Sequence, residues 1–389
     1  MVMPELTAEE SAHSARLCER ICEQIAAQGG WISFERFMEL ALYEPGLGYY
    51  SAGATKFGRD GDFITAPEIS PLFSHCLARQ CSEVIERLLP ADILEVGAGS
   101  GAMAAEVLLE LTAQRRLPQR YYILEVSAEL RERQRQTIAA RVPAEVAARV
   151  EWLDHLPTDL RGIVLANEVL DAFPVQRFCV RGTQIKALGV TWRAGGFDWA
   201  ETRADPALEA GVRSIERARG ELLPDGYVSE LNLRIQPWMN GLAHTLREGV
   251  ALFIDYGLPQ QQYYRSERSE GTLLCHYRHR FHDDPLVNVG LQDIGAWVDF
   301  TAIANAACEA RLRVAGFTTQ AHFLIGCGIE HYLAGSDAQP MLERMQLARQ
   351  AMMLTLPGEM GERFKVLGLS ANYDHPLCGF SIRDLAATL

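Results

Sequence analysis

Two short stretches of the sequence carry side chains that could do chemistry. In IVLANEVLDAFPV, residues 163–175, four apolar residues run directly into Asn167 and Glu168, and Asp171 follows three positions later. Carboxylates beside an amide can accept the N–H groups of a cationic substrate or take up a proton, so these three residues are candidate catalytic groups. The alternative is structural: Asp171 would cap a helix, and Glu168 would be a first-turn charge favoured by the helix dipole.

The second stretch is LEVGAGSG, residues 94–101, which predicts a strand, a tight turn and the start of a helix. Glycines let the main chain approach a ligand closely, and a helix N-terminus offers free N–H groups. Glu125 ends the next predicted strand, YYILEV, where a carboxylate can accept hydrogen bonds from a ribose diol. The stretch therefore predicts a nucleoside-containing cofactor.

Two cofactors fit this turn. Gly97, Gly99 and Ala102 satisfy the GxGxxG/A pattern of dinucleotide sites such as those for NAD. S-adenosylmethionine uses a turn of the form acidic-x-Gly-x-Gly-x-Gly, for which Glu95 supplies the acid and Gly101 the third glycine. A carboxylate would repel a pyrophosphate but suits an ammonium and a sulfonium, so we favour S-adenosylmethionine. A turn without any ligand is the third reading, although three glycines cost folding entropy.

Alternating strands and helices must position both stretches. The strands predicted at 92–96, 121–126, 149–153, 162–166 and 250–257 are separated by helical segments, which indicates a parallel sheet covered by helices. Ligands of such sheets bind beyond the carboxyl ends of the strands, where both stretches lie. Asp154, after the third strand, is expected to contact the adenine, and Leu153, the last residue of that strand, is expected to bind the cofactor; the alternative for Asp154 is a helix or turn cap.

The remaining chain predicts additions to this α/β core. We expect helices at 6–28, 34–43 and 69–89, an antiparallel meander over 176–203, a late helix closed by Gly316, and final strands at 317–325 and 364–371. The expected parts are an N-terminal helical lobe with a lid loop (1–90), the first part of the cofactor-binding core (91–174), an inserted substrate-facing segment (175–249) and the remainder of the core (250–389).

Composition limits the function classes. The 389 residues carry a net charge of −13, which argues against a nucleic-acid-binding protein and is compatible with a cationic partner. The nine scattered cysteines predict reduced thiols and a cytoplasmic location. We expect no secretory signal, no membrane insertion and no metal, because His276, His279 and His282 lack the spacing of paired zinc ligands.

Six motifs in order resemble one family. They are YEPGLGYYSAG, FGRDGDFITAPEISPLFS, ILEVGAGSG, ILEVS, LANEVLDAFPVQRF and FIDYG, and together they resemble the MidA-type methyltransferases. The resemblance implies a Rossmann-like class I methyltransferase fold; for the mitochondrial members, which assist assembly of respiratory complex I, it implies protein arginine methylation. The chain departs from the family pattern in VNVGLQDIGAWVDF, where Trp297 stands at a position usually held by histidine.

The loop GRDGDFITAPE, residues 58–68, is expected to close over the cofactor as a lid, with Gly58 and Gly61 as flexible points and Thr65 and Glu68 near the cofactor. Its alternative is a purely structural crossover.

The expected activity is transfer of a methyl group from S-adenosylmethionine to an arginine nitrogen of a protein. Three alternatives stay open: a methyltransferase for small-molecule nitrogen or oxygen, an assembly factor that keeps the cofactor pocket without turnover, and an NAD-dependent oxidoreductase. The expected partner is a protein with an exposed arginine segment, and a homodimer is one expected assembly.

Overall fold

The computed structural model describes residues 6–52, 65–334 and 340–389. Spatial contacts group the chain into unit 1 (1–63, 171–234 and 260–297) and unit 2 (64–170, 235–259 and 298–389). The four-part division expected from the sequence follows chain order and expected roles, and its boundaries at 90, 174 and 249 stay a prediction.

Unit 2 contains the central sheet. Its helices and strands are α3 (Ala66–Ile69), α4 (Pro71–Leu88), β2 (Asp92–Val96), α5 (Ala102–Ala113), β3 (Tyr121–Leu124), α6 (Ala128–Arg141), α7 (Ala144–Ala147), β4 (Val150–Leu153), β5 (Leu160–Asn167), α9 (Ile235–Thr245), β10 (Leu246–Leu258), β14 (Val298–Asp299), α11 (Phe300–Glu309), β15 (Arg313–Thr319), α12 (Gln320–Gly326), α13 (Ile329–Ala334), α14 (Met341–Thr355), α15 (Met360–Arg363), β16 (Phe364–Ala371), η2 (Cys378–Phe380) and η3 (Ala386–Thr388).

The strand order of this sheet is β15-β16-β10-β5-β2-β3-β4, with the short β14 beside β10. Strands β10, β5, β2, β3 and β4 pair in parallel, and β16 is antiparallel to both of its neighbours. Going outward from β2, the chain first builds one side through β3 and β4 and then the other through β5 and β10. The order therefore reverses between β2 and β5, and ligands of doubly wound sheets bind at such a switch point. The predicted α/β class is confirmed.

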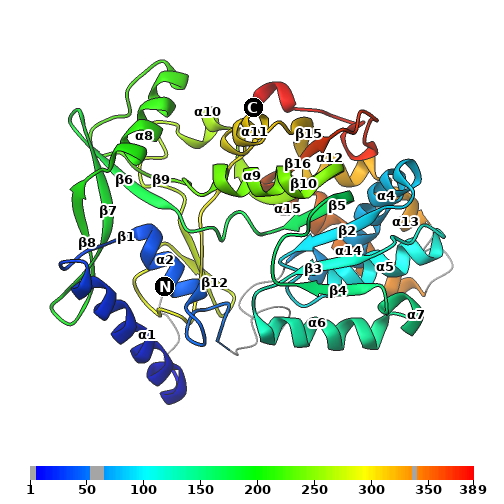
Figure 1. The fold of residues 1–389 in the computed structure, drawn as a ribbon, viewed down its shortest axis with the longest axis horizontal. Helices are drawn as coiled ribbons and strands as arrows, with labels where there is room; N and C mark the ends of the chain where they lie inside the picture. Colours follow the sequence, from blue (N-terminus) through cyan, green and yellow to red (C-terminus); the bar gives the residue numbers. More distant parts are fainter. Residues whose placement is uncertain (1–5, 53–64, 335–339) are drawn as a thin grey trace. The chain divides into compact units, whose positions relative to one another are not determined.

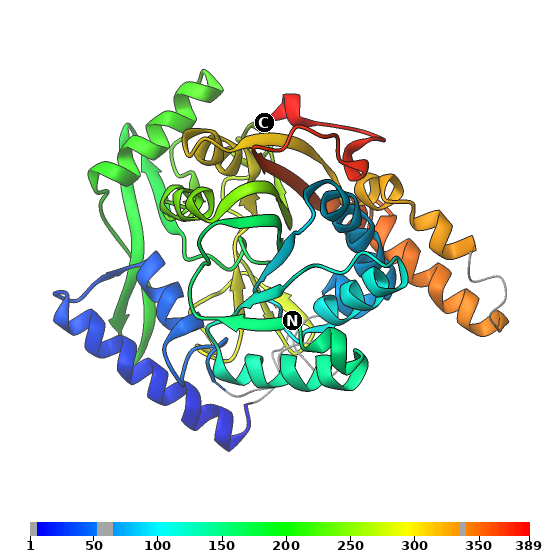
Figure 2. The ribbon, with the colours of Figure 1, turned by 45° about the vertical axis from the view of Figure 1, so that its right-hand side comes forward.

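Helices cover both faces of the sheet. On one side α4 packs against α5 and β5, and on the other α9 packs against α11 and β10 (Figure 2). Helix α4 starts as its sequence predicts, because the Ser70 side chain accepts the Leu72 N–H at 3.3 Å and Pro71 occupies the first turn. The buried stripe of α4, including Phe73 and Leu77, joins the core under the sheet.

Two predictions for the late chain are wrong. Helix α11 ends at Glu309 and not near Gly316, because Arg311 takes a left-handed conformation with φ of 66° and the N–H of Leu312 turns back to the carbonyl of Ala307 at 2.9 Å. The strand expected at 317–325 stops at Thr319, whose side chain accepts the N–H of His322 and so begins α12.

Unit 1 is built on an antiparallel sheet (Figure 1). Its helices and strands are α1 (Ala8–Ala27), β1 (Ile32–Ser33), α2 (Phe34–Tyr43), β6 (Gln176–Arg181), β7 (Gln184–Arg193), β8 (Gly196–Arg203), α8 (Pro206–Arg219), β9 (Val228–Leu231), α10 (Gln260–Tyr263), β11 (Leu274–Tyr277), β12 (Arg280–His282) and β13 (Asp293–Gly295).

The expected meander is present as β6, β7 and β8, which pair in sequence. Ala194 and Gly195 both have positive φ at the β7–β8 turn, the conformation that two-residue hairpins favour. Strands β1 and β9 complete this five-stranded sheet, and α2 packs on it through Phe34 and Phe37. A separate three-stranded sheet has the order β12-β11-β13.

Candidate functional site

The glycine-rich turn follows β2 at the switch point of the sheet. Gly97 and Gly101 have φ of 67° and 82°, which side-chain-bearing residues rarely adopt. A Cβ on Gly97 would lie 3.2 Å from the side chain of Val169, and one on Gly101 would lie 3.0 Å from Cα of Gln134. The turn, with Gly99 between them, is therefore tight on its protein side and leads into the N-terminus of α5. The N–H of Ala102 donates to the hydroxyl of Ser100 at 3.3 Å, and the N–H groups that follow in the first turn remain for a ligand.

Glu95 lies under this turn with no solvent exposure. One carboxylate oxygen accepts the Tyr121 hydroxyl at 2.5 Å, and the other, Oε1, has no hydrogen-bond partner among the described residues. Burial raises the pKa of Glu95 to about 7, and nearby Glu125 adds to the rise. A buried, half-satisfied carboxylate of this kind is stabilised by a cation placed beside it.

Glu125, just past β3, is also buried. Its carboxylate accepts the N–H of Ser127 at 2.9 Å and the amide of Gln134 at 3.1 Å, and burial raises its pKa. The same Gln134 amide donates to the carbonyl of Gly99 at 3.0 Å, while its oxygen accepts the indole N–H of Trp152 at 2.9 Å. One glutamine thus connects the glycine turn to the carboxylate expected to bind ribose.

Gln134 was not among the site residues predicted from the sequence, yet the sequence contains a signal for it. It lies on the α6 face that also holds Leu130 and Ile138, at four-residue spacing, and all three are buried. A polar side chain on the apolar face of an otherwise charged helix needs internal hydrogen bonds. The need for internal hydrogen bonds at this position could have identified Gln134 as a site residue.

Leu153 is the last residue of β4, and Asp154 follows it directly. Arg131 binds here, donating to the carbonyls of Glu125 and Leu153 at 2.6 and 2.7 Å and to the carboxylate of Asp154 at 2.7 Å. The Asp154 side chain is 76% exposed. Arg131 therefore ties together the ends of β3 and β4, and the adenine contact of Asp154 stays a prediction.

Only the end of the predicted lid can be placed. Gly58 and Gly61 lie outside the described residues. Thr65 precedes α3, and Glu68 on α3 accepts a hydrogen bond from the hydroxyl of Ser100 in the glycine turn. The structure thus brings Glu68 to the cofactor turn.

Asn167 and Glu168 lie at the end of β5, the strand next to β2. Val96 pairs with Ala166, so Asn167 stands one residue beyond the register of β2. The amide nitrogen of Asn167 donates to Glu168 Oε1 at 3.1 Å, while its buried oxygen has no partner in the described part of the chain. Glu168 has φ of 53°, a strained conformation that non-glycine residues adopt mainly where the surroundings enforce it, often at functional sites.

Asp255, near the C-terminal end of β10, holds this strained segment in place. Its buried carboxylate accepts the N–H groups of Val169 at 3.2 Å and Leu170 at 3.0 Å, and the N–H of Glu168 donates to the carbonyl of Ile254. The sequence indicates that Asp255 ends a strand beside the site, but not which main-chain groups it binds, since those lie 85 and 86 residues away.

Asp171 belongs to unit 1 and is buried, with its carbonyl accepting the N–H of Ala296 at 3.0 Å. Residues 168–175 form turns and no helix. The structural alternative for these acids, a helix cap at Asp171 and a first-turn charge at Glu168, is therefore wrong. The hydrogen bonds from residues 169 and 170 to Asp255 and the start of β6 at Gln176 leave no helix between them.

The residues of unit 2 suit S-adenosylmethionine on two observations. The unsatisfied Glu95 Oε1 fits a cationic ligand and would repel a pyrophosphate. The glycine turn, with Gln134 holding Glu125 behind it, leaves main-chain N–H groups and a carboxylate for a nucleoside. These groups favour S-adenosylmethionine over NAD.

Comparison with known proteins agrees with this reading. Residues 76–318 match a family described as "Putative S-adenosyl-L-methionine-dependent methyltransferase". A crystal structure of a Burkholderia thailandensis protein bound to S-adenosyl-homocysteine is 41% identical, with full coverage of both chains and a TM-score of 0.95. A native structure from the same organism is 40% identical with a TM-score of 0.92.

Curated relatives are more distant. The Drosophila melanogaster protein named "Protein arginine methyltransferase NDUFAF7 homolog, mitochondrial" is 28% identical over 97% of this chain and 91% of its own. The human protein named "Protein arginine methyltransferase NDUFAF7, mitochondrial" is 28% identical over 87% of this chain and 80% of its own. The predicted cytoplasmic location is wrong by this comparison, because these relatives are named as mitochondrial proteins; cysteine usage reports a reducing environment and does not identify the compartment.

Proposed function

The chain belongs to this family of S-adenosyl-L-methionine-dependent methyltransferases, and from that premise we propose that it methylates an arginine nitrogen of a protein substrate. The observation that carries the proposal is the carboxylate of Glu168, held in a left-handed turn at the switch point of the sheet, one strand away from the glycine turn. The names of the curated relatives support the same substrate class.

An arginine acceptor places a specific demand on the site. A guanidinium has a pKa above roughly 12 and is a poor nucleophile, so the enzyme must orient it and receive its proton. In this proposal Glu168 accepts guanidinium N–H groups and takes the proton lost when the nitrogen–carbon bond forms. The free oxygen of Asn167 accepts a further N–H. Asp171, predicted from the sequence as a catalytic residue, remains the candidate second carboxylate.

The cofactor supplies a methyl group on a sulfonium sulfur, and the remaining groups of the chain hold and neutralise it. Glu95 offers its free oxygen to the cofactor's positive charge, Gly97, Gly99 and Gly101 shape the turn, and Glu125 receives the ribose hydroxyls. Thr65, Glu68, Leu153 and Asp154 complete the proposed cofactor site. Alignment of the nitrogen with the methyl group is the main contribution expected of such a site.

The acceptor is tested with the purified protein, S-adenosylmethionine carrying a labelled methyl group, and lysate of a strain that lacks this protein. Label in protein that is released as methylarginine on acid hydrolysis supports the proposal. Label in a small molecule would assign the activity to the small-molecule alternative. No label in any fraction, despite measured binding of S-adenosyl-homocysteine, would favour the assembly factor without turnover.

A further inference from the structure

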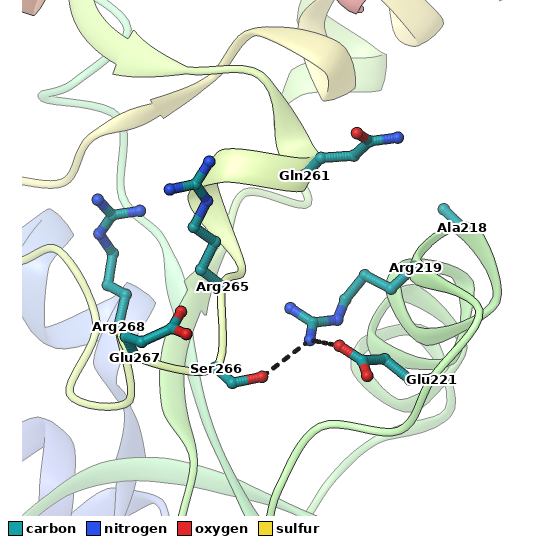
Figure 3. Close-up of a pocket in the computed structure, with 8 residues that line it drawn as sticks. All are labelled: Ala218, Arg219, Glu221, Gln261, Arg265, Ser266, Glu267 and Arg268. Atoms are coloured by element: carbon teal, nitrogen blue, oxygen red, sulfur yellow. Dashed lines mark hydrogen bonds and ion pairs between the residues drawn. The ribbon is translucent and has the colours of Figure 1, made fainter.

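Unit 1 contains a polar cavity that the methyl-transfer reaction does not use. It has a volume of about 840 Å³ and lies between the C-terminal end of α8 on one side and α10 with the segment that follows it on the other (Figure 3). Its lining residues are Ala218, Arg219, Glu221, Gln261, Arg265, Ser266, Glu267 and Arg268. The volume falls in the range of pockets that bind molecules larger than a single ion.

Arg219 is the buried cation of this cavity. Figure 3 shows it reaching from α8 toward the opposite segment, where it donates to the hydroxyl of Ser266 at 3.2 Å. Its side chain is only 7% exposed, and its Nε has no hydrogen-bond partner in the described part of the chain. Its one ion-pair partner among the described residues is Glu221, whose side chain is 65% exposed. A buried guanidinium held by one largely solvated carboxylate can accept a further anion.

Two more guanidinium groups line the same cavity. Arg268 is held in place, because it donates to the carbonyls of Gln262 and Tyr263 and lies 5.2 Å from the centre of the Trp297 ring. Arg265 is exposed, and its guanidinium makes no ion pair or hydrogen bond with the residues that the structure describes. Trp297, the departure from the family pattern, thus supports one wall of the cavity.

We propose that this cavity binds an acidic peptide segment through the guanidinium groups of Arg219, Arg265 and Arg268. A guanidinium matches a carboxylate with two parallel hydrogen bonds. The two lining carboxylates, Glu221 and Glu267, oppose a compact multiply charged phosphate more than separate single charges along a peptide. Gln261 and Ser266 can bind the peptide main chain. Binding at this cavity is separate from methyl transfer and needs no cofactor.

The test measures fluorescence anisotropy of labelled hexaglutamate, with labelled hexaglutamine as the uncharged comparison. We expect hexaglutamate to bind and hexaglutamine not to bind. Arg265→Gln should weaken hexaglutamate binding about fivefold, as for a partly exposed charge pair, and should leave folding unchanged because this side chain has no partner to lose. Arg217→Gln is the matched control: this arginine is exposed, lies on α8 two residues before Arg219 and is outside the cavity lining, so the variant should bind as wild type.

Three results would overturn the proposal. Equal binding of hexaglutamate and hexaglutamine would show that the cavity does not recognise the negative charges of the peptide. Equal loss in the two variants would show that only overall charge matters. Competition by inorganic phosphate at lower concentration than unlabelled hexaglutamate would assign the cavity to phosphate instead. None of these results depends on methyl-transfer activity, so the proposed function would stand or fall separately.

Discussion

Three structural features of Glu168 bear on its proposed role. It is half-buried, its main chain is left-handed, and its carboxylate is oriented by a neighbouring amide. Strain of this kind costs about 1–3 kcal/mol and persists where the surroundings enforce it, as the hydrogen bonds of Val169 and Leu170 to Asp255 do here. The strain supports a role in the reaction.

Glu168→Gln keeps the size of the side chain but removes the charge and the proton-accepting group. We expect kcat to fall about 100-fold or more, as for removal of a positioned general base, while the Kd for S-adenosyl-homocysteine stays within about twofold. Calorimetry and steady-state kinetics measure both. Glu129→Gln, an exposed change on α6, is the control. Near-wild-type turnover of Glu168→Gln would show that the catalytic assignment is wrong.

Glu95 makes stability depend on pH. Its pKa is about 7 in the folded chain against an ordinary 4.5, so between these values the unfolded chain loses the proton first. The contribution of Glu95 to the free energy of unfolding is therefore fully present below about pH 4.5 and is lost as the pH rises to about 7. In the cofactor-free protein the loss is on the order of 3 kcal/mol.

Urea unfolding of wild type and Glu95→Gln across that range tests this. As the pH rises, the unfolding free energy of wild type should fall relative to that of Glu95→Gln, because the amide of the variant cannot ionise. A constant difference in unfolding free energy between the two proteins from pH 4.5 to 7 would mean that the Glu95 carboxylate has its usual pKa. It would then not be a buried group that a bound cation stabilises.

At the scale of elements, α6 acts as a support for the cofactor turn. Gln134 on its inner face bonds to the turn, to the carboxylate after β3 and to Trp152 on β4. Three elements thus depend on one side chain, which identifies it as a positioning residue.

Gln134→Leu leaves three polar groups without that partner: the buried carboxylate of Glu125, and the partly buried carbonyl of Gly99 and indole N–H of Trp152. We expect a loss of about 2 kcal/mol or more in unfolding free energy and about tenfold weaker binding of S-adenosyl-homocysteine. Gln136→Leu, on the exposed face of the same helix, should change neither quantity. Binding is measured by calorimetry at a temperature where both variants are folded. Undiminished affinity in Gln134→Leu would remove Gln134 from the site.

The turn after β5 depends in the same way on the end of β10. Asp255→Asn replaces one of the two acceptor oxygens with a donor, so an N–H of residues 169–170 or of Tyr256 loses its acceptor. The expected result is about 1–3 kcal/mol lower stability and a lower kcat with little change in cofactor affinity. Asp374→Asn on the surface serves as the comparison. A change in cofactor Kd with normal kcat would point to a role in the cofactor site instead.

At the scale of the whole molecule, the cofactor residues described above all come from unit 2. Ligand binding to the folded state stabilises the part that holds the ligand, by about 2.7 kcal/mol at a concentration of 100 times Kd. Saturating S-adenosyl-homocysteine should therefore slow amide hydrogen exchange in residues 94–101, 121–125 and 163–170.

The sheet of unit 1, residues 176–203, provides the internal control for this experiment and should exchange at nearly the same rate with and without ligand. Slowed exchange confined to 176–203 would place the cofactor elsewhere and contradict the site described here. Mass spectrometry of peptic fragments resolves both regions in one measurement.

Local sequence alone determined the glycine turn, the alternation of strands and helices around it, and the acids at the end of β5. These features depend on neighbouring residues: a strand of apolar residues, glycines where the main chain must turn tightly, and a helix that starts at once. They were sufficient to predict the α/β fold and the cofactor. The end of α11 at Glu309 was missed because no glycine marks the left-handed residue that follows it, Arg311.

Tertiary structure decided how the site is held. The left-handed turn at Glu168 is maintained by Asp255 from a strand some 85 residues later in the chain, and Gln134 acquires its role only where α6 meets the turn and two strand ends. The arginines around the unit 1 cavity likewise come from two distant segments. Such contacts leave no periodic trace in the sequence, because hydrogen bonds and charges act across space, whereas propensity and hydrophobic period act along the chain.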